Sequence, residues 1–483
     1  MYFETFKRGC ILSYKAILLS CLSGLVLQGC GDNRVEVDAS LASRETTASV
    51  THSEKSEASF YRGASIYEVN VRQYSEEGSL AAVTRDLPRL KSLGVDILWL
   101  MPIQPIGQKN RKGELGSYYS IADYTAVNPE FGDLDDLKAL VDAAHANGQK
   151  VILDWVANHT AWDHPWIETN ADWYTRNAQG KITDPIDDQG KPWGWTDVAD
   201  LNYDNRALWQ GMTDAMKFWL IEADVDGFRC DVAGEVPTEF WNFARPQLDA
   251  VKPVFMLAEA EKPELQKAFD MSYGWEFHHL TNAIAKGEKP ASIVHEYIVD
   301  RINRFDADHM AMMFTTNHDE NSWNGTVFER YGEAHRAMAV LSFTVDGMPL
   351  LYSGQEASMN KRLKFFEKDA IDWGDYELQG FYAKLLAIKE STPALWSGAD
   401  GGRYRPLSHA GGNDQVLGFR RSHNTGDVDV WINFSNAAVT IKRDQLPVSD
   451  GVLWGQVKIV DGELVLAPYQ SVIFGEKIAL VDS

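Results

Sequence analysis

The sequence predicts an α/β chain: a (β/α)8 TIM barrel with a small domain inserted after the third strand and an antiparallel β domain at the C-terminus. Eight short, largely apolar segments alternate with helical patterns between residues 60 and 384, as in a parallel sheet covered on both faces. Residues 160–204 interrupt this alternation and are too long and irregular for an ordinary strand-to-helix loop. From residue 385 onward, short strand-like runs lie between turn residues, which is typical of an antiparallel sheet or sandwich.

Size and charge agree with this architecture. The chain has 483 residues, and its 46 Lys and Arg against 69 Asp and Glu give a formal net charge of −23. That length fits a barrel with a modest appendage. Nucleic-acid binding is not expected, because phosphates require a face rich in Lys and Arg.

The first thirty residues predict export from a bacterial cell. Lys7, Arg8 and Lys15 flank the start of a mostly apolar run, residues 16–27, that is too short to span a bilayer comfortably. The run ends in a Leu-x-Gly-Cys sequence that resembles the lipobox of bacterial lipoproteins, in which the cysteine, here Cys30, becomes lipidated. We therefore expect residues 1–30 to be a lipoprotein signal peptide. An ordinary secretory signal with an incidental Cys30 is the alternative.

Residues 31–59 predict a flexible tether, because they lack Phe, Trp and Tyr and are rich in Ser, Thr, Ala and Glu. The exported lipoprotein would then be held at a cell membrane, on the periplasmic side or at the outer surface, through its lipid alone. Cys10 and Cys21 belong to the signal, so Cys230 is the only cysteine in the protein body. This count excludes a disulfide framework.

The predicted barrel strands are short and mostly apolar. They span residues 66–71, 95–100, 150–155, 225–232, 254–259, 269–273, 311–316 and 349–352. A helix is predicted between the first two from apolar residues at three- and four-residue spacing, ending at Gly94. Asp133, with Asp136 three residues later, predicts the cap of the next helix.

The two non-barrel regions have their own signals. The insertion, residues 160–204, contains five tryptophans, of which we expect one or two to form a platform for a sugar and the others to be core: Trp162, Trp166, Trp173, Trp193 and Trp195. The C-terminal domain, residues 385–483, is expected to be sandwich-like. Its predicted strands are 415–420, 428–434, 438–441, 455–459 and 463–466.

Acidic residues follow four of the predicted barrel strands, at the end where barrel enzymes carry their catalytic groups. The segments read Asp-Trp-Val-Ala-Asn-His from 154, Gly-Phe-Arg-Cys-Asp from 227, Leu-Ala-Glu from 257 and Thr-Asn-His-Asp from 316. Because side chains alternate along a strand, Arg229 and Asp231 must point the same way and Cys230 the other. We expect the guanidinium to keep Asp231 ionised as a nucleophile, and Asp154 to be a buried hydrogen-bond acceptor.

These four segments, in this order, resemble the signature regions of the α-amylase family of glycoside hydrolases, and the likeness covers the chain after Phe60. The resemblance implies a retaining double displacement in which Asp231 is the nucleophile, Glu259 the acid and base, and Asp319 a holder of sugar hydroxyls. It further implies four substrate-binding residues around the cleaved bond: Tyr119, His159, Arg229 and His318.

The segment after the nucleophile departs from many family members. Asp-Val-Ala-Gly-Glu, residues 231–235, resembles the neopullulanase and cyclomaltodextrinase branch rather than members that bind a structural calcium there. No cofactor is expected for the chemistry. Asn158 is the candidate ligand if calcium binds. The difference at residues 231–235 argues against calcium at this position. Glu235 and Trp323 are candidates for a substrate platform; for Glu235 an exposed, solvated side chain is the alternative.

The resemblance thus implies a retaining hydrolase of α-1,4-glucosidic bonds in starch-like glucans or maltodextrins. Two alternatives keep the same site: a glucanotransferase, and an enzyme active on α-1,6 bonds. A third belongs to another class, a catalytically inactive glycan-binding lipoprotein, which the presence of all three carboxylates disfavours. The expected partner is an α-glucan, and the sequence does not determine the oligomeric state.

Overall fold

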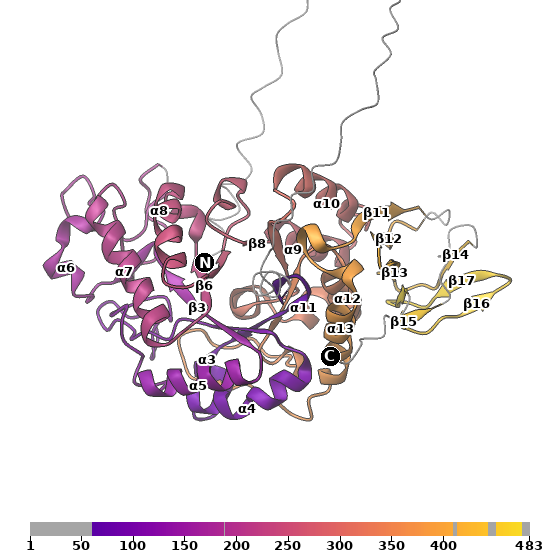
Figure 1. Cartoon of the computed structure of the whole chain (residues 1–483), viewed down its shortest axis with the longest axis horizontal. Helices are drawn as coiled ribbons and strands as arrows, with labels where there is room; N and C mark the ends of the chain where they lie inside the picture. The colour runs from indigo at the N-terminus through magenta and orange to yellow at the C-terminus, as the bar shows by residue number, and fades with distance from the viewer. Residues whose placement is uncertain (1–59, 188, 409–412, 443–450, 476–483) are drawn as a thin grey trace, which may run out of the picture. The chain divides into compact units, whose positions relative to one another are not determined.

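The structure is a computed structural model that describes residues 60–187, 189–408, 413–442 and 451–475 (Figure 1). The predicted signal peptide, Cys30 and the tether therefore lie outside the described residues. No helix among the described ranges has the length and apolar character needed to cross a membrane.

The first part of the described chain forms a closed barrel of eight parallel strands, which confirms the predicted fold class. Each of the eight predicted strands is present, although several are shorter than predicted. In the order around the barrel they are β1 (Ile66–Val69), β2 (Ile97–Leu100), β3 (Lys150–Val156), β6 (Gly227–Asp231), β7 (Phe255–Ala258), β8 (Met271–Tyr273), β9 (Met310–Met313) and β10 (Met348–Tyr352).

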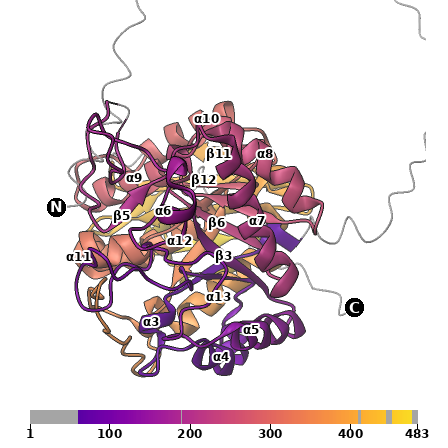
Figure 2. The same ribbon diagram turned by 90° about the vertical axis from the view of Figure 1, so that its left-hand side faces the viewer.

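Helices cover the outside of this barrel in both views (Figures 1 and 2). The main ones are α4 (Leu80–Leu93), α5 (Leu134–Ala146), α7 (Arg206–Glu222), α8 (Thr238–Asp249), α9 (Trp275–Ala285), α10 (Ile293–Arg304), α12 (His335–Thr344) and α13 (Gln379–Ser391). The predicted stops and caps are confirmed: Gly94 ends α4 at φ +99°, and Asp133 forms a capping box with Asp136 on α5.

The barrel interior is packed with side chains. Apolar residues from every barrel strand except β6 form one buried cluster, including Ile66, Trp99 and Tyr273. Strand β6 contributes Arg229 instead, in register with Asp154 of β3 and Leu257 of β7. The polar groups of the barrel thus enter a layer that is otherwise apolar.

The insertion after β3 holds little regular structure. Its strands β4 (His159–Ala161) and β5 (Val198–Asp200) pair antiparallel, and a short helix, α6 (Trp166–Thr169), lies between them. Trp166 and Trp173, both half-buried, pack on each other with ring centroids 4.8 Å apart. Trp193 and Trp195 form a second pair at 4.7 Å.

The C-terminal strands form two antiparallel sheets beside α12 and α13 (Figure 1). The larger has the order β11 (Arg403–Leu407), β12 (Val416–His423), β13 (Gly426–Asn433), β18 (Ser471–Phe474) and β15 (Val452–Trp454). The smaller consists of β14 (Val439–Ile441), β17 (Glu463–Leu466) and β16 (Ile459–Val460). Residues of both sheets share one apolar cluster, so they pack on each other.

Three details differ from the prediction. Strands β11, β15 and β18 are missing from it. Of the predicted strand at 455–459 only Ile459 lies in a strand, β16, because β15 ends at Trp454 and Gly455 adopts φ +85°. The change from barrel to β domain also does not fall at residue 385, since α13 continues to Ser391.

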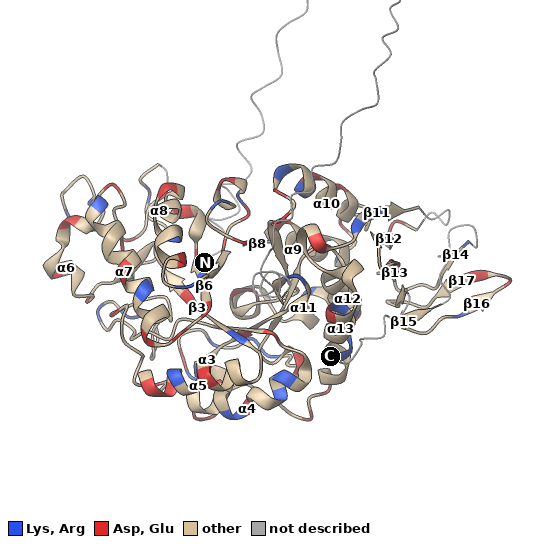
Figure 3. Ribbon diagram, in the orientation of Figure 1, with Lys and Arg blue, Asp and Glu red and all other residues tan. Residues whose placement is uncertain are grey.

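Charges of both signs lie on the helices of the barrel. Figure 3 shows Lys and Arg among the more numerous Asp and Glu of these helices.

Replacement of Gly227 by alanine is expected to prevent closure of the barrel. Gly227 begins β6 at φ +154°, and an added Cβ would lie 1.9 Å from the carbonyl oxygen of Phe255 on β7. We expect a loss of at least about 3 kcal/mol in the free energy of unfolding, measured by denaturant titration. Gly380→Ala is the control, because nothing lies within 4 Å of its added Cβ. Equal stability of the two variants would contradict the prediction.

Candidate active site

The predicted catalytic carboxylates come from three strand ends of the barrel. Asp231 is the last residue of β6, Glu259 directly follows β7, and Asp319 follows β9. Arg229 joins the first two, because its Nη1 lies 3.0 Å from Asp231 Oδ1 and its Nη2 lies 2.9 Å from Glu259 Oε2. The charges of Glu259 and Asp319 both act on Asp231, so the three carboxyls share one site.

Local backbone geometry fixes Glu259. Val232, directly after Asp231, adopts φ +37°, a strained conformation for a β-branched residue. Its N–H donates to Glu259 Oε2 at 2.7 Å. With Arg229 on the same oxygen, Oε2 acts as an acceptor, which leaves Oε1 as the oxygen able to carry a proton toward a substrate. Cys230 points away, fully buried, and burial raises the pKa of its thiol, so it is a packed, unreactive side chain.

The Arg229 guanidinium is buried and also contacts Asp154 and Tyr273. Nη1 lies 2.8 Å from Asp154 Oδ1, and Nε donates to the Tyr273 hydroxyl at 3.0 Å. Asp154 accepts further hydrogen bonds from Trp99 Nε1 and the Tyr119 hydroxyl, each at 3.1 Å. The structure thus places Asp154 where the sequence suggested, as a buried acceptor below the catalytic groups.

His318 connects Asp319 to Tyr119 and to Glu68 of β1. Its Nε2 lies 2.6 Å from the Tyr119 hydroxyl and 3.4 Å from Asp319 Oδ2, while its Nδ1 lies 2.5 Å from Glu68 Oε1. The rings of Tyr119 and His318 are stacked at 5.4 Å. Both ring nitrogens are therefore engaged, and the orientation of the imidazole is fixed.

Burial dominates the titration of the site. It raises the pKa of Asp231 well above its usual range; the charge of Glu259 adds to this, and Arg229 opposes it. Burial also raises the pKa of Asp319 to about 6, against the effect of His318. Burial thus opposes the ionisation of Asp231, and the Arg229 guanidinium favours it.

The other residues predicted for the site, His159, Trp323 and Glu235, make different kinds of contact. His159 is buried near Tyr119, burial lowers its pKa to about 3, and its ring lies 5.6 Å from that of Trp195. Trp323 packs against Phe365 at 5.3 Å. Glu235 pairs with Lys262 at 3.9 Å.

Sequence reasoning missed Glu68, Trp99 and Tyr273, which hold His318, Asp154 and Arg229 respectively. Glu68 and Trp99 lie inside their barrel strands, and Tyr273 is the last residue of β8. A signal existed for Glu68, since it is a lone carboxylate in the otherwise apolar run of β1 and is fully buried. The sequence held no such signal for Trp99 and Tyr273, because an aromatic residue in a strand is normally interpreted as part of the hydrophobic core.

Asn158, the candidate calcium ligand, lies beside the site. Its side-chain amide contacts His159 Nδ1 at 3.3 Å, and its carbonyl accepts from the N–H of Leu201. Within the part of the chain that the structure describes, no group of three or more His, Cys, Asp and Glu is placed to hold a metal ion.

Fold and site together define a (β/α)8-barrel enzyme with an acid–base set of carboxylates at one mouth of the barrel. The alpha-amylase catalytic-domain model matches residues 46–402. Alpha-amylase MalA of Haloarcula japonica is 30% identical over 395 residues, which are 78% of this chain and 56% of that protein. A maltosyltransferase of Cereibacter sphaeroides, acting on alpha-1,4-glucan and maltose-1-phosphate by its name, is 30% identical over 315 residues, 60% of this chain and 45% of that one.

A solved structure agrees with these matches. The crystal structure of an alpha-amylase from Lactobacillus plantarum has a TM-score of 0.76 and 32% identity, covering 86% of this chain and 100% of that one. The chain spans about half the length of the two curated relatives above. The chain belongs to the alpha-amylase family of glycoside hydrolases.

Replacement of either candidate catalytic carboxyl is expected to lower kcat at least about 1,000-fold without unfolding the protein. Asp231→Asn removes the nucleophile, so no substrate restores turnover. Glu259→Gln removes the proton donor, so an aryl glycoside whose leaving group needs no protonation restores part of it. Glu264→Gln is the control, because it makes the same chemical change at an exposed glutamate shortly after Glu259 in the sequence. Equal behaviour of both variants on the aryl glycoside would contradict the assigned roles.

Asp319→Asn is expected to stabilise the protein at neutral pH while removing activity. The pKa of Asp319 rises from 3.8 to about 6 on folding, so the free energy of unfolding falls as pH rises through this interval. The variant is therefore expected to gain about 1–3 kcal/mol at pH 7 and nothing below about pH 4. Unfolding of both proteins at the two pH values measures this gain, and a gain that is the same at both would refute the explanation.

Proposed function

We propose that the protein is a retaining hydrolase of α-1,4-glucosidic bonds in starch-like glucans or maltodextrins. The supporting observation is that one guanidinium, Arg229, contacts both Asp231 and Glu259, at 3.0 and 2.9 Å. Such shared contact favours the short carboxyl separation of a retaining pair, about 5–5.5 Å, over the wider spacing of an inverting pair. Family membership supports an α-glucan as the substrate.

The proposed reaction has two displacements. A carboxylate oxygen of Asp231 forms a bond to the anomeric carbon while the glycosidic bond breaks and Glu259 gives its proton to the leaving oxygen. Glu259, now ionised, then takes a proton from a water whose oxygen bonds to the same carbon, and Asp231 is released. Two inversions give net retention. Asp319 and His318 hold sugar hydroxyls, and no cofactor takes part.

Transfer in place of hydrolysis is the second candidate. A sugar hydroxyl would replace the water in the second displacement, and the maltosyltransferase relative supports this outcome. Cleavage of α-1,6 bonds is the third, favoured by the sequence after Asp231. A catalytically inactive binding protein is disfavoured, because the complete carboxyl set, with its costly burial, has no use in binding alone.

The test is a substrate panel with products followed over time. On maltoheptaose we expect shorter maltodextrins whose new reducing ends first appear as the α-anomer in proton NMR, because retention preserves the configuration. Longer products would show transfer, and cleavage of panose or pullulan with intact α-1,4 bonds would show α-1,6 activity. Initial release of the β-anomer would contradict the retaining mechanism, and binding without any cleavage would support the inactive alternative.

We also propose that the protein is an exported bacterial lipoprotein with Cys30 lipidated. The support is the signal-like N-terminus and the Leu-x-Gly-Cys sequence before the tether. The wild-type protein is expected to incorporate labelled palmitate and to sediment with membranes, whereas Cys30→Ala is expected to do neither. Cys230→Ala is the control, and membrane association that survives Cys30→Ala would contradict the anchor.

A further inference from the structure

Two loops at the mouth of the barrel that carries the candidate catalytic carboxyls are joined to each other. One loop follows β2 and contains residues 113–118, and the other follows β10 and contains residues 363–367. The backbone N–H of Leu115 donates to the carbonyl of Phe366 at 2.8 Å. Gly113 comes so close that an added Cβ would lie 2.3 Å from the Cβ of Phe366. We call these two segments together the mouth wall.

A buried arginine ties the two segments of the mouth wall together. Arg72 lies in α3 (Val71–Tyr74), shortly after β1, and is 2% exposed. Its Nη1 donates to the carbonyls of Gly116 and Phe365, at 3.0 and 3.2 Å. Its Nη2 donates to the carbonyl of Leu115 at 3.2 Å. One guanidinium thus satisfies backbone carbonyls from both loops.

Two buried amide side chains hold the segment after β10 from other sides. The Nε2 of Gln73 donates to the carbonyls of Lys364 and Glu367, at 3.0 and 2.7 Å. Asn321, which follows β9, accepts through Oδ1 from the N–H of Leu363 at 2.9 Å. Both amides are buried, so breaking these bonds would leave unpaired polar groups in the interior. The mouth wall is therefore a fixed boundary of the barrel mouth.

The mouth wall places an aromatic ring beside the residues predicted to bind the sugar. The ring of Phe365 is nearly parallel to that of Tyr119, with an interplanar angle of 14° and ring centroids 6.2 Å apart. The same ring lies 6.5 Å from that of His318. Tyr119 and His318 are the predicted contacts of the glucose unit at the cleaved bond. Phe365 therefore lies next to the site of that unit, and it is only half-buried.

The mouth wall lies on the side of the barrel opposite the candidate proton donor. Its two segments follow β2 and β10, the neighbours of β1, which Arg72 follows. Glu259 follows β7, which is four strands from β1 in both directions around the closed barrel. In the proposed reaction Glu259 protonates the leaving oxygen at C1 of the bound glucose. Because C4 lies across the pyranose ring from C1, the O4 of that glucose points toward the wall.

We infer that the mouth wall makes the enzyme act from the non-reducing end of an α-glucan, because it leaves room for at most two glucose units on that side of the cleaved bond. An α-1,4-glucan continues through O4 toward its non-reducing end, which is the direction that the wall blocks. The rest of the chain extends the other way, past Glu259. Phe365 and Phe366 are the specificity-determining side chains. The inference rests on the proposed function and adds to it which bond of the chain is cut.

The test follows the first products from maltoheptaose that carries a fluorescent label at its reducing end. Removal of one or two units from the other end leaves a labelled chain of six or five units. We expect these to be the main early products of the wild-type enzyme, because a cut further along the chain would need space that the wall occupies. Main early products with four or fewer labelled units would overturn the inference.

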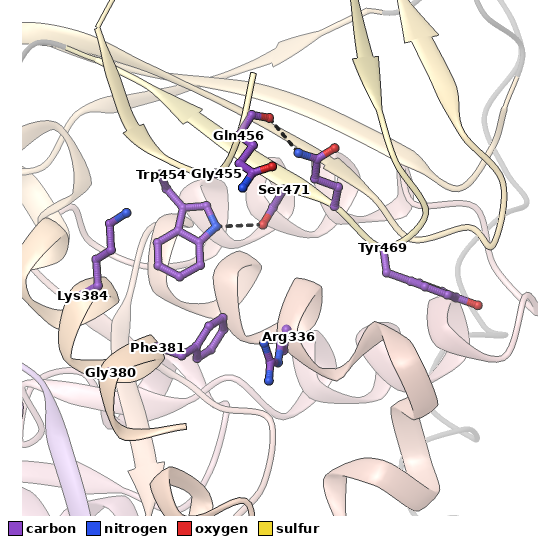
Figure 4. A pocket seen from close by; sticks show the side chains of 10 residues that line it. Arg336, Gly380, Phe381, Lys384, Trp454, Gly455, Gln456, Tyr469 and Ser471 are labelled. Carbon is purple, nitrogen blue, oxygen red and sulfur yellow. Dashed lines mark hydrogen bonds between the residues drawn. The ribbon is translucent and has the colours of Figure 1, made fainter. Parts of the chain in front are cut away.

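Two variants test whether the wall is the cause. Phe365→Ala and Phe366→Ala each remove a ring and keep the backbone hydrogen bonds of the wall. Both are expected to raise the share of labelled products with four or fewer units at least about 5-fold. Phe381→Ala is the control, because it makes the same change at a half-buried phenylalanine that lines a cavity of about 460 Å³ beside α13, outside the active site (Figure 4). An unchanged product pattern in both wall variants would overturn the inference.

Failure of the proposed function gives a different result. A protein that cleaves no bond of the labelled maltoheptaose would overturn the proposed hydrolase and this inference with it. Internal cleavage by the wild-type enzyme would agree with the hydrolase and overturn the inference alone.

Discussion

The site depends on one buried cation. Arg229 has no exposed surface, yet its guanidinium contacts Asp154, Asp231 and Glu259 within 3.0 Å and the hydroxyl of Tyr273. Removing such a group would leave several buried carboxyls without a counter-charge, which is costlier than losing the ion pairs themselves. The barrel makes the arrangement available because strand β6 places Arg229 beside Asp154 of β3 and Leu257 of β7, in an interior that the other strands line mostly with apolar side chains.

Activity and stability are opposed in this cluster. Burial raises the pKa values of Asp154, Asp231 and Asp319, so folding works against their ionisation. Val232 adds backbone strain directly after Asp231, and its N–H is used to hold Glu259. Both features are unfavourable for folding, and both belong to the arrangement that holds the candidate nucleophile and proton donor in place. The apolar barrel interior and the helices around it supply the stability that this requires.

The same molecule presents aromatic rings in two settings. Around Arg229 and His318, the rings of Trp99, Tyr119 and Tyr273 are buried and supply hydrogen bonds to ions. In the cavity beside α13, the ring of Trp454 is half-buried and oriented by a single hydrogen bond. The first setting positions the reacting groups, whereas the second orients a ring that takes no part in the active site.

The sequence by itself determined the order of the barrel strands, the helix caps at Gly94 and Asp133, and the strand-end positions of Asp231, Glu259 and Asp319, because periodicity, capping and alternation are local properties of the chain. Only the tertiary structure decided which partners each carboxyl meets. Glu68 lies 250 residues before His318, and Asp154 lies 75 before Arg229, so no local pattern pairs them. The raised pKa of Asp231 also depends on the tertiary structure, because its burial and its neighbouring charges exist only after the barrel closes. The ends of the C-terminal strands were likewise set by contacts, as where Gly455 turns against Ser471.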